Sequence, residues 1–192
     1  MLSQPRMDLV RQFVIAGHGN LVKVKEMLDA DPTLLNESYP WSDKDSETAI
    51  QAAAQVGSSS VAEFLLSRGA PLHICTAAML GRSKQVQSML KGDPSLSGAT
   101  GAHGIPLLSH AALSGNPELV ELVWGHGATT GATLGLVNAV SRGYPQVVRW
   151  LLENTEADAN AKNFEGKTCL VIAGGRGDKE SEELLKSHGA TG

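Results

Sequence analysis

Six times along the chain, a short run of small residues leads to a glycine, and an amphipathic segment ending in two aliphatic residues follows. Apolar positions in these segments recur three or four residues apart, which is the spacing of one face of an α-helix. Each unit is therefore predicted to be a pair of helices that turns at its glycine. Because one pair cannot bury its own apolar face, the pattern predicts a solenoid of stacked pairs. The turn glycines are Gly19, Gly57, Gly81, Gly115, Gly143 and Gly177.

The repeated unit resembles the ankyrin repeat. Its first helix begins with segments similar to the family's Thr-Pro-Leu-His motif, and three units end in the family's Gly-Ala pair. These segments are Thr48–Gln51, Pro106–Ser109 and Thr168–Val171, and the pairs begin at Gly69, Gly127 and Gly189. The resemblance implies an all-α fold, an ankyrin-repeat α-solenoid of six helix-turn-helix repeats with short β-hairpin or loop fingers. It implies one domain over residues 1–192, with repeats near 8–36, 43–73, 74–100, 101–130, 131–162 and 163–192.

The spacing of the turn glycines predicts that the fingers between the helix pairs differ in length. Gly19 and Gly57 are 38 residues apart, whereas Gly57 and Gly81 are only 24 apart. The helix pairs are intact in every unit, so the connections must absorb these differences. We therefore expect a long second finger that carries Trp41, an absent third finger, a clipped fifth finger, and fourth and sixth fingers of ordinary length.

Composition and charge narrow the function. The chain has 42% hydrophobic and 19% charged residues and a net charge of −4, and its Lys and Arg residues are scattered, so we expect no nucleic-acid partner. No stretch reaches the roughly 18 apolar residues of a membrane span, and no signal peptide is recognisable, so we expect a cytoplasmic protein without a membrane partner.

Cys75 and Cys169 lie three repeats apart, too far for a disulfide, and are expected in the core. Both terminal repeats look like polar caps, so a complete array is expected. Nothing in the sequence demands an oligomer, so we expect a monomer.

The resemblance also implies where a ligand binds, because ankyrin repeats usually bind on the concave side, at the fingertips and at the residues just before each turn glycine. The candidate residues before the glycines are His18, Gln55, Val56, Met79, Leu80, Leu113, Arg142 and Arg176. The candidates on the fingers are Trp41, Asp45, Glu47, His103, Ile105 and Phe164.

Three functions remain open. No nucleophile and base pair, paired carboxylates or metal-ligand spacing is recognisable, so we expect no catalytic residue, metal or cofactor. The leading hypothesis is an interaction module that binds a partner protein or peptide in the concave groove. The alternative is a small-molecule or enzymatic pocket between the second and fourth fingers, with Met79 and Leu80 as its floor and side chains such as His18, Glu47 and His103 on its rim. A third is a companion subunit of an enzyme or toxin encoded nearby.

Several residues have two interpretations. Trp41 either contacts a partner or packs against its own finger. Met79 and Leu80 either form an apolar floor or pack beneath neighbouring fingers. His110 occupies a position where an apolar residue is expected, and we expect it to bond to the backbone of a neighbouring connection rather than to act in catalysis.

Overall fold

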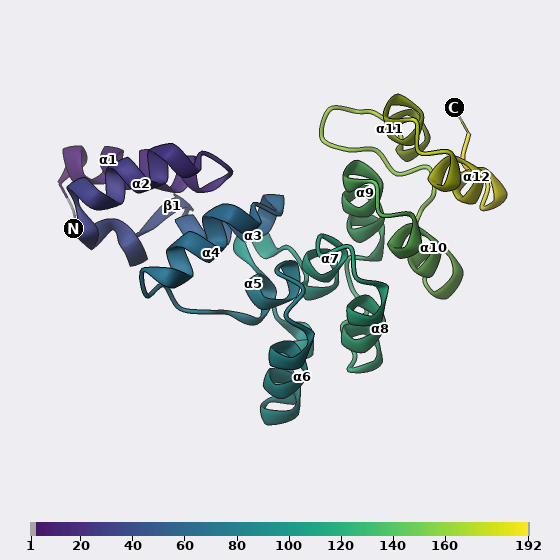
Figure 1. Ribbon diagram of the computed structural model, residues 1–192, viewed down its shortest axis with the longest axis horizontal. Helices are drawn as coiled ribbons and strands as arrows, with labels where there is room; N and C mark the ends of the chain where they lie inside the picture. Colours follow the sequence, from purple (N-terminus) through teal and green to yellow (C-terminus); the bar gives the residue numbers. More distant parts are fainter. Residues whose placement is uncertain (1–2, 192) are drawn as a thin grey trace.

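The computed structural model describes residues 3–191. These residues form twelve α-helices, three short 3-10 helices and one β-hairpin (Figure 1). The α-helices are α1 (Gln4–Gly17), α2 (Leu21–Ala30), α3 (Ala49–Val56), α4 (Ser59–Ser67), α5 (Ile74–Met79), α6 (Ser83–Gly92), α7 (Leu107–Ala112), α8 (Pro117–Gly125), α9 (Ala132–Arg142), α10 (Pro145–Asn154), α11 (Cys169–Arg176) and α12 (Lys179–Ser187). The remaining elements are β1 (Ser38–Ser42), β2 (Asp45–Thr48), η1 (Pro32–Asn36), η2 (Pro94–Gly98) and η3 (Ala102–Gly104).

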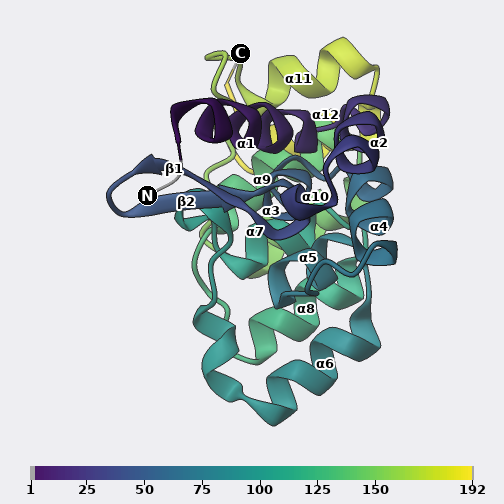
Figure 2. The same ribbon diagram turned by 90° about the vertical axis from the view of Figure 1, so that its left-hand side faces the viewer.

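The helices follow one another as antiparallel pairs, each odd-numbered inner helix packing against the outer helix that comes after it. Figure 1 shows the pairs succeeding one another along the long axis of the molecule, with the two ends of the chain at opposite sides. Figure 2 looks along this array from its N-terminal end. The predicted solenoid of helix pairs is therefore confirmed.

The predicted turn glycines end the inner helices. Gly57 follows α3 with φ of 70°, and Gly143 follows α9 with φ of 71°, in the left-handed region where a side chain is unfavourable. Each then leads into its outer helix after a single residue, Ser58 or Tyr144. The small residues before these glycines keep the inner helices thin enough for close stacking, since Ala52, Ala53 and Ala139 are fully buried.

The fingers alternate between long and short, as the glycine spacing predicts. The second finger is the antiparallel hairpin β1–β2, and the fourth and sixth are loops held by single bridges, Thr100 to Pro106 and Lys162 to Thr168. The third finger is absent because the loop after α4 leads directly into α5, and the fifth is a short loop before α9.

The core consists of two clusters of buried side chains. The larger spans α5 to α12, and the smaller spans α1 to α4 together with Met79 of α5 and Leu113 at the end of α7. Helix α3 contacts α5 less extensively than α5 contacts α7. Because the third finger is missing, β2 of the second finger packs directly on η3 of the fourth. The predicted gap between these two fingers is therefore filled by contact.

Both cysteines are free and buried, as expected. Burial raises the pKa of Cys75 to about 12 and, together with the nearby Asp158 carboxylate, the pKa of Cys169 to about 11. No helix among the described residues is both long enough and apolar enough to cross a membrane.

Candidate concave binding site

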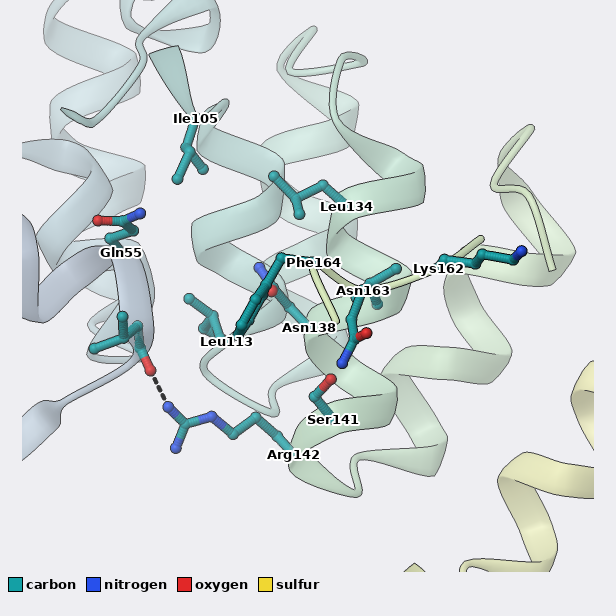
Figure 3. Close-up of a pocket in the computed structure, with 12 residues that line it drawn as sticks. Gln55, Ile105, Leu113, Leu134, Asn138, Ser141, Arg142, Lys162, Asn163 and Phe164 are labelled. Atoms are coloured by element: carbon teal, nitrogen blue, oxygen red, sulfur yellow. Dashed lines mark hydrogen bonds between the residues drawn. The ribbon is translucent and has the colours of Figure 1, made fainter. Parts of the chain in front are cut away.

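A pocket of about 350 Å³ opens on the concave face between the end of α3, helix α9 and the sixth finger (Figure 3). We call it the groove pocket. It takes five residues from α9, the helix that follows the clipped fifth finger. Its lining residues are Gln55, Val56, Ile105, Leu113, Leu134, Val137, Asn138, Ser141, Arg142, Lys162, Asn163 and Phe164.

Helix α9 forms one wall of the groove pocket because of its residue spacing. Leu134, Val137, Asn138 and Ser141 are three or four residues apart and so share one face of the helix. The short loop before Ala132 brings no hairpin over this face, and Leu134 is 39% exposed. Leu134 is thus the apolar side chain that this face of α9 presents to solvent.

Phe164 is the most exposed large apolar side chain of the described region, at 99%. The tight turn of the sixth finger presents it, because the Asn163 side-chain oxygen accepts hydrogen bonds from the N–H groups of Glu165 and Lys167, both at 3.0 Å. Gly166 completes the turn with φ of 78°. Figure 3 shows the Phe164 ring in the middle of the view, over the pocket rather than outside it. A fully exposed aromatic ring beside an apolar pocket is typical of an interaction site.

Two arginines close the lower edge of the site by binding the ends of inner helices. Arg142 donates to the carbonyl of Val56, joining α9 to the distant end of α3 (Figure 3). Arg176 donates to the carbonyls of Ser141 at 3.1 Å and Arg142 at 3.0 Å. Glycine lies beneath each guanidinium: a Cβ at Gly57 would lie 2.8 Å from Arg142 and one at Gly143 2.6 Å from Arg176, so a side chain at either position would displace the arginine.

A second cluster lies where the second and fourth fingers meet, and we call His18, Asp45, Glu47 and His103 the clasp. Glu47 is fully buried between two imidazoles, with its oxygens 3.5 Å from His18 Nε2 and 3.6 Å from His103 Nε2. Asp45 binds the other ring nitrogen of His103 and accepts its backbone N–H at 3.1 Å. The Trp41 indole N–H donates to Glu47 at 2.9 Å, so Trp41 packs within its own finger.

The clasp joins the groove pocket through one side chain, because Gln55 lines the pocket and also lies 3.1 Å from His18 Nε2. His110 contacts the same helix, α3, at the residue before Gln55. It is buried, and its Nδ1 lies 3.2 Å from the carbonyl oxygen of Ala54. His110 therefore bonds to backbone as expected, but to that of helix α3 rather than to that of a neighbouring connection. Burial lowers the pKa of His110, although its contacts with backbone carbonyls oppose this effect.

Comparisons with known proteins identify the repeated unit. A family model described as an ankyrin repeat matches residues 45–77, and a model of many copies of ankyrin repeats matches residues 125–173. The chain is an ankyrin-repeat protein. An ankyrin repeat-containing protein of Treponema pallidum is 36% identical to it over 95 residues, which cover 46% of this chain and 32% of that protein. The ankyrin-repeat protein therefore spans about a third of the length of this curated relative.

A crystal structure of an ankyrin repeat domain from Acinetobacter baumannii is also similar, with a TM-score of 0.49 and 23% sequence identity. The similarity covers 94% of the ankyrin-repeat protein and 98% of the crystallised chain.

The structure brings most of the residues that the sequence marked as candidates together in two groups. Gln55, Val56, Ile105, Leu113, Arg142 and Phe164 line the groove pocket, with Arg176 beside it. His18, Trp41, Asp45, Glu47 and His103 meet in and around the clasp.

Met79 does not form the expected floor of a pocket between the second and fourth fingers. Its side chain is 1% exposed and belongs to the smaller core cluster, against which Leu80 also packs. Of the two interpretations left open for these residues, packing beneath their neighbours is the one observed. The reason is that α3 and the end of α7 close over α5 where the third finger is missing.

The sequence analysis missed five residues of the groove pocket as candidates: Leu134, Val137, Asn138, Lys162 and Asn163. The sequence could have indicated Leu134, Val137 and Asn138, since a clipped finger uncovers the helix that follows it. We expected this effect at the third finger, where packing cancels it, but not at the fifth.

Proposed function

We propose that this ankyrin-repeat protein is an interaction module that binds a peptide segment of a partner protein in the groove pocket. The observation that carries the proposal is the fully exposed Phe164 ring at the mouth of an apolar pocket of about 350 Å³. A partner would insert an apolar side chain between Phe164, Leu134 and Ile105. Burial of these exposed side chains supplies a driving force of roughly 25 cal/mol for each Å² removed from water.

The proposal includes the state in which the protein acts. All six helix pairs are proposed to be ankyrin repeats, and the protein is proposed to act as a monomer. Its two free, buried thiols suit a reducing compartment such as the cytoplasm.

A random peptide library displayed on phage tests the proposal directly. Peptides selected on the immobilised protein are expected to bind Phe164→Ala at least about tenfold more weakly, since an aromatic anchor at an interface centre usually carries that much affinity. Leu134→Ala should weaken the same peptides. Val22→Ala is the matched control, because Val22 is also an exposed apolar residue but lies on outer helix α2.

Binding is measured by titrating each purified variant with the synthetic selected peptides. If no peptide is selected, or if the selected peptides bind Phe164→Ala and the wild type equally, the groove pocket is not the binding site and the proposed function fails.

A further inference from the structure

The concave face around the groove pocket carries three cations, although the whole chain has a net charge of −4. Arg142 and Lys162 line the pocket, and Arg176 binds the backbone of Ser141 and Arg142 at its edge. Figure 3 shows the Lys162 side chain at the edge of the site, extending away from Phe164. None of the residues that line the pocket is acidic. The site is therefore locally positive on an acidic protein.

These arginines differ from most others in the protein in what they bind. Four other arginines each form an ion pair with a carboxylate: Arg6, Arg68, Arg82 and Arg149. Within residues 3–191, by contrast, no carboxylate pairs with Arg142, Arg176 or Lys162, and both arginines bond to main-chain carbonyls instead. Their positive charge thus has no acidic partner within the described chain.

The remaining hydrogen-bonding capacity of the site consists mainly of donors. A guanidinium has five N–H donors, and Arg142 and Arg176 use only some of theirs on helix ends. Both lone-pair sites of the Asn163 oxygen are taken by backbone N–H groups, so its amide group offers N–H donors to a ligand. The carbonyl bonds also hold the two guanidinium groups in place before binding, which lowers the entropic cost of using them.

A donor-rich, acid-free site next to an apolar pocket selects a ligand that combines an apolar side chain with negatively charged acceptors. Arginine and carboxylate form charge-assisted hydrogen bonds, which are stronger than neutral ones. Resting on the function proposed above, we infer that the occupant is an acidic peptide segment. It places an aromatic or aliphatic side chain in the groove pocket, and an Asp or Glu within a few residues of that side chain meets Arg142 and Arg176.

The sequences of the selected phage peptides test this inference. Asp and Glu are expected to be enriched near the apolar anchor relative to the unselected library. The affinity of a selected peptide for the wild-type protein should fall several-fold between about 50 mM and about 500 mM NaCl, because salt screens exposed charges. This salt dependence is measured on the unmodified protein and so does not depend on how any variant folds.

A pair of charge-removing variants supplies the second measurement. Lys162→Gln/Arg176→Gln should bind a selected peptide about fivefold more weakly or worse and lose most of the salt dependence. Lys84→Gln/Lys91→Gln removes the same charge from outer helix α6 and should bind as the wild type does. Thermal unfolding of both variants checks that each is folded.

The outcomes distinguish the two proposals. Selected peptides could require Phe164 and yet show no enrichment in Asp and Glu, no salt dependence and no loss of affinity for Lys162→Gln/Arg176→Gln. This result would support the interaction module but contradict the inference that its occupant is acidic. If Lys162→Gln/Arg176→Gln and Lys84→Gln/Lys91→Gln weakened peptide binding equally, the acidic occupant would also be contradicted, since the effect would then come from the net charge of the protein. Failure to select any peptide that requires Phe164 would remove the proposed function itself.

Discussion

At the scale of single residues, His110 shows how a polar side chain is accommodated in the core of a repeat array. Its Nδ1 bonds to Ala54, but its Nε2 has no hydrogen-bond partner among the described residues. Gly101 lies against this nitrogen so closely that a Cβ there would be 2.5 Å away. Protonating such a ring is unfavourable because the added charge would be buried, which is why burial lowers the pKa of His110.

This lowered pKa predicts that acid destabilises the fold through His110. An unfolded histidine binds a proton as the pH falls below about 6.5, whereas the folded one resists, so stability is present above that pH and is lost below it. His110→Asn keeps an N–H donor for Ala54 and removes the titration. The free energy of unfolding, measured with urea between pH 7.5 and pH 5, should therefore depend less steeply on pH in His110→Asn, by up to about 1.4 kcal/mol per pH unit. Parallel curves would contradict the prediction.

At the scale of elements, the lengths of the fingers decide which parts of the array touch. The absent third finger lets the second and fourth fingers meet in the clasp, and the clipped fifth finger opens the groove pocket. His103 at this meeting point has φ of 57° and is the one non-glycine residue between positions 3 and 191 with positive φ. Such a conformation persists only where surrounding contacts enforce it, here those with Asp45 and Glu47.

Two substitutions at His103 separate backbone strain from side-chain contacts. His103→Ala and His103→Gly both remove the contacts with Asp45 and Glu47, but only glycine adopts positive φ without cost. We expect His103→Ala to be less stable than His103→Gly by about 1 kcal/mol, measured by urea unfolding. The two variants would have equal stability, or the order would reverse, if His103 were not held in this conformation in solution.

The sequence was sufficient to predict the repeats and the finger lengths, because both follow from local spacing. Gly57 and Gly143 mark turns through their own conformational preference, and the residues between the glycines set how long each connection can be. The contacts between fingers were not predictable in this way. Whether His103 reaches Asp45, and whether Met79 is covered, depend on how successive helix pairs are rotated, and small side-chain packing terms in the core set that rotation. The pocket was therefore expected two fingers too early.

At the scale of the whole molecule, the division of the core predicts unequal stability along the array. In a solenoid each helix pair is stabilised mainly by its immediate neighbours, so a weak interface limits how far cooperativity extends. The interface between α3 and α5 is such a place, since it separates the two core clusters. The clasp, the His110 bond to Ala54 and the Arg142 bond to Val56 cross it and join the two parts.

We therefore predict that helices α1 to α4 unfold before α7 to α10 as urea is raised. Hydrogen exchange followed by mass spectrometry should show the amides of α1 to α4 losing protection together, at a lower urea concentration than those of α7 to α10.

Cys75 and Cys169 belong to the larger cluster and have strongly raised pKa values, so a thiol reagent should label both only when that cluster opens. Since the groove pocket takes Gln55 and Val56 from one part and α9 from the other, a bound peptide should bring the two transitions closer together. A single coincident transition in the free protein would show that the crossing contacts already make the array one cooperative unit.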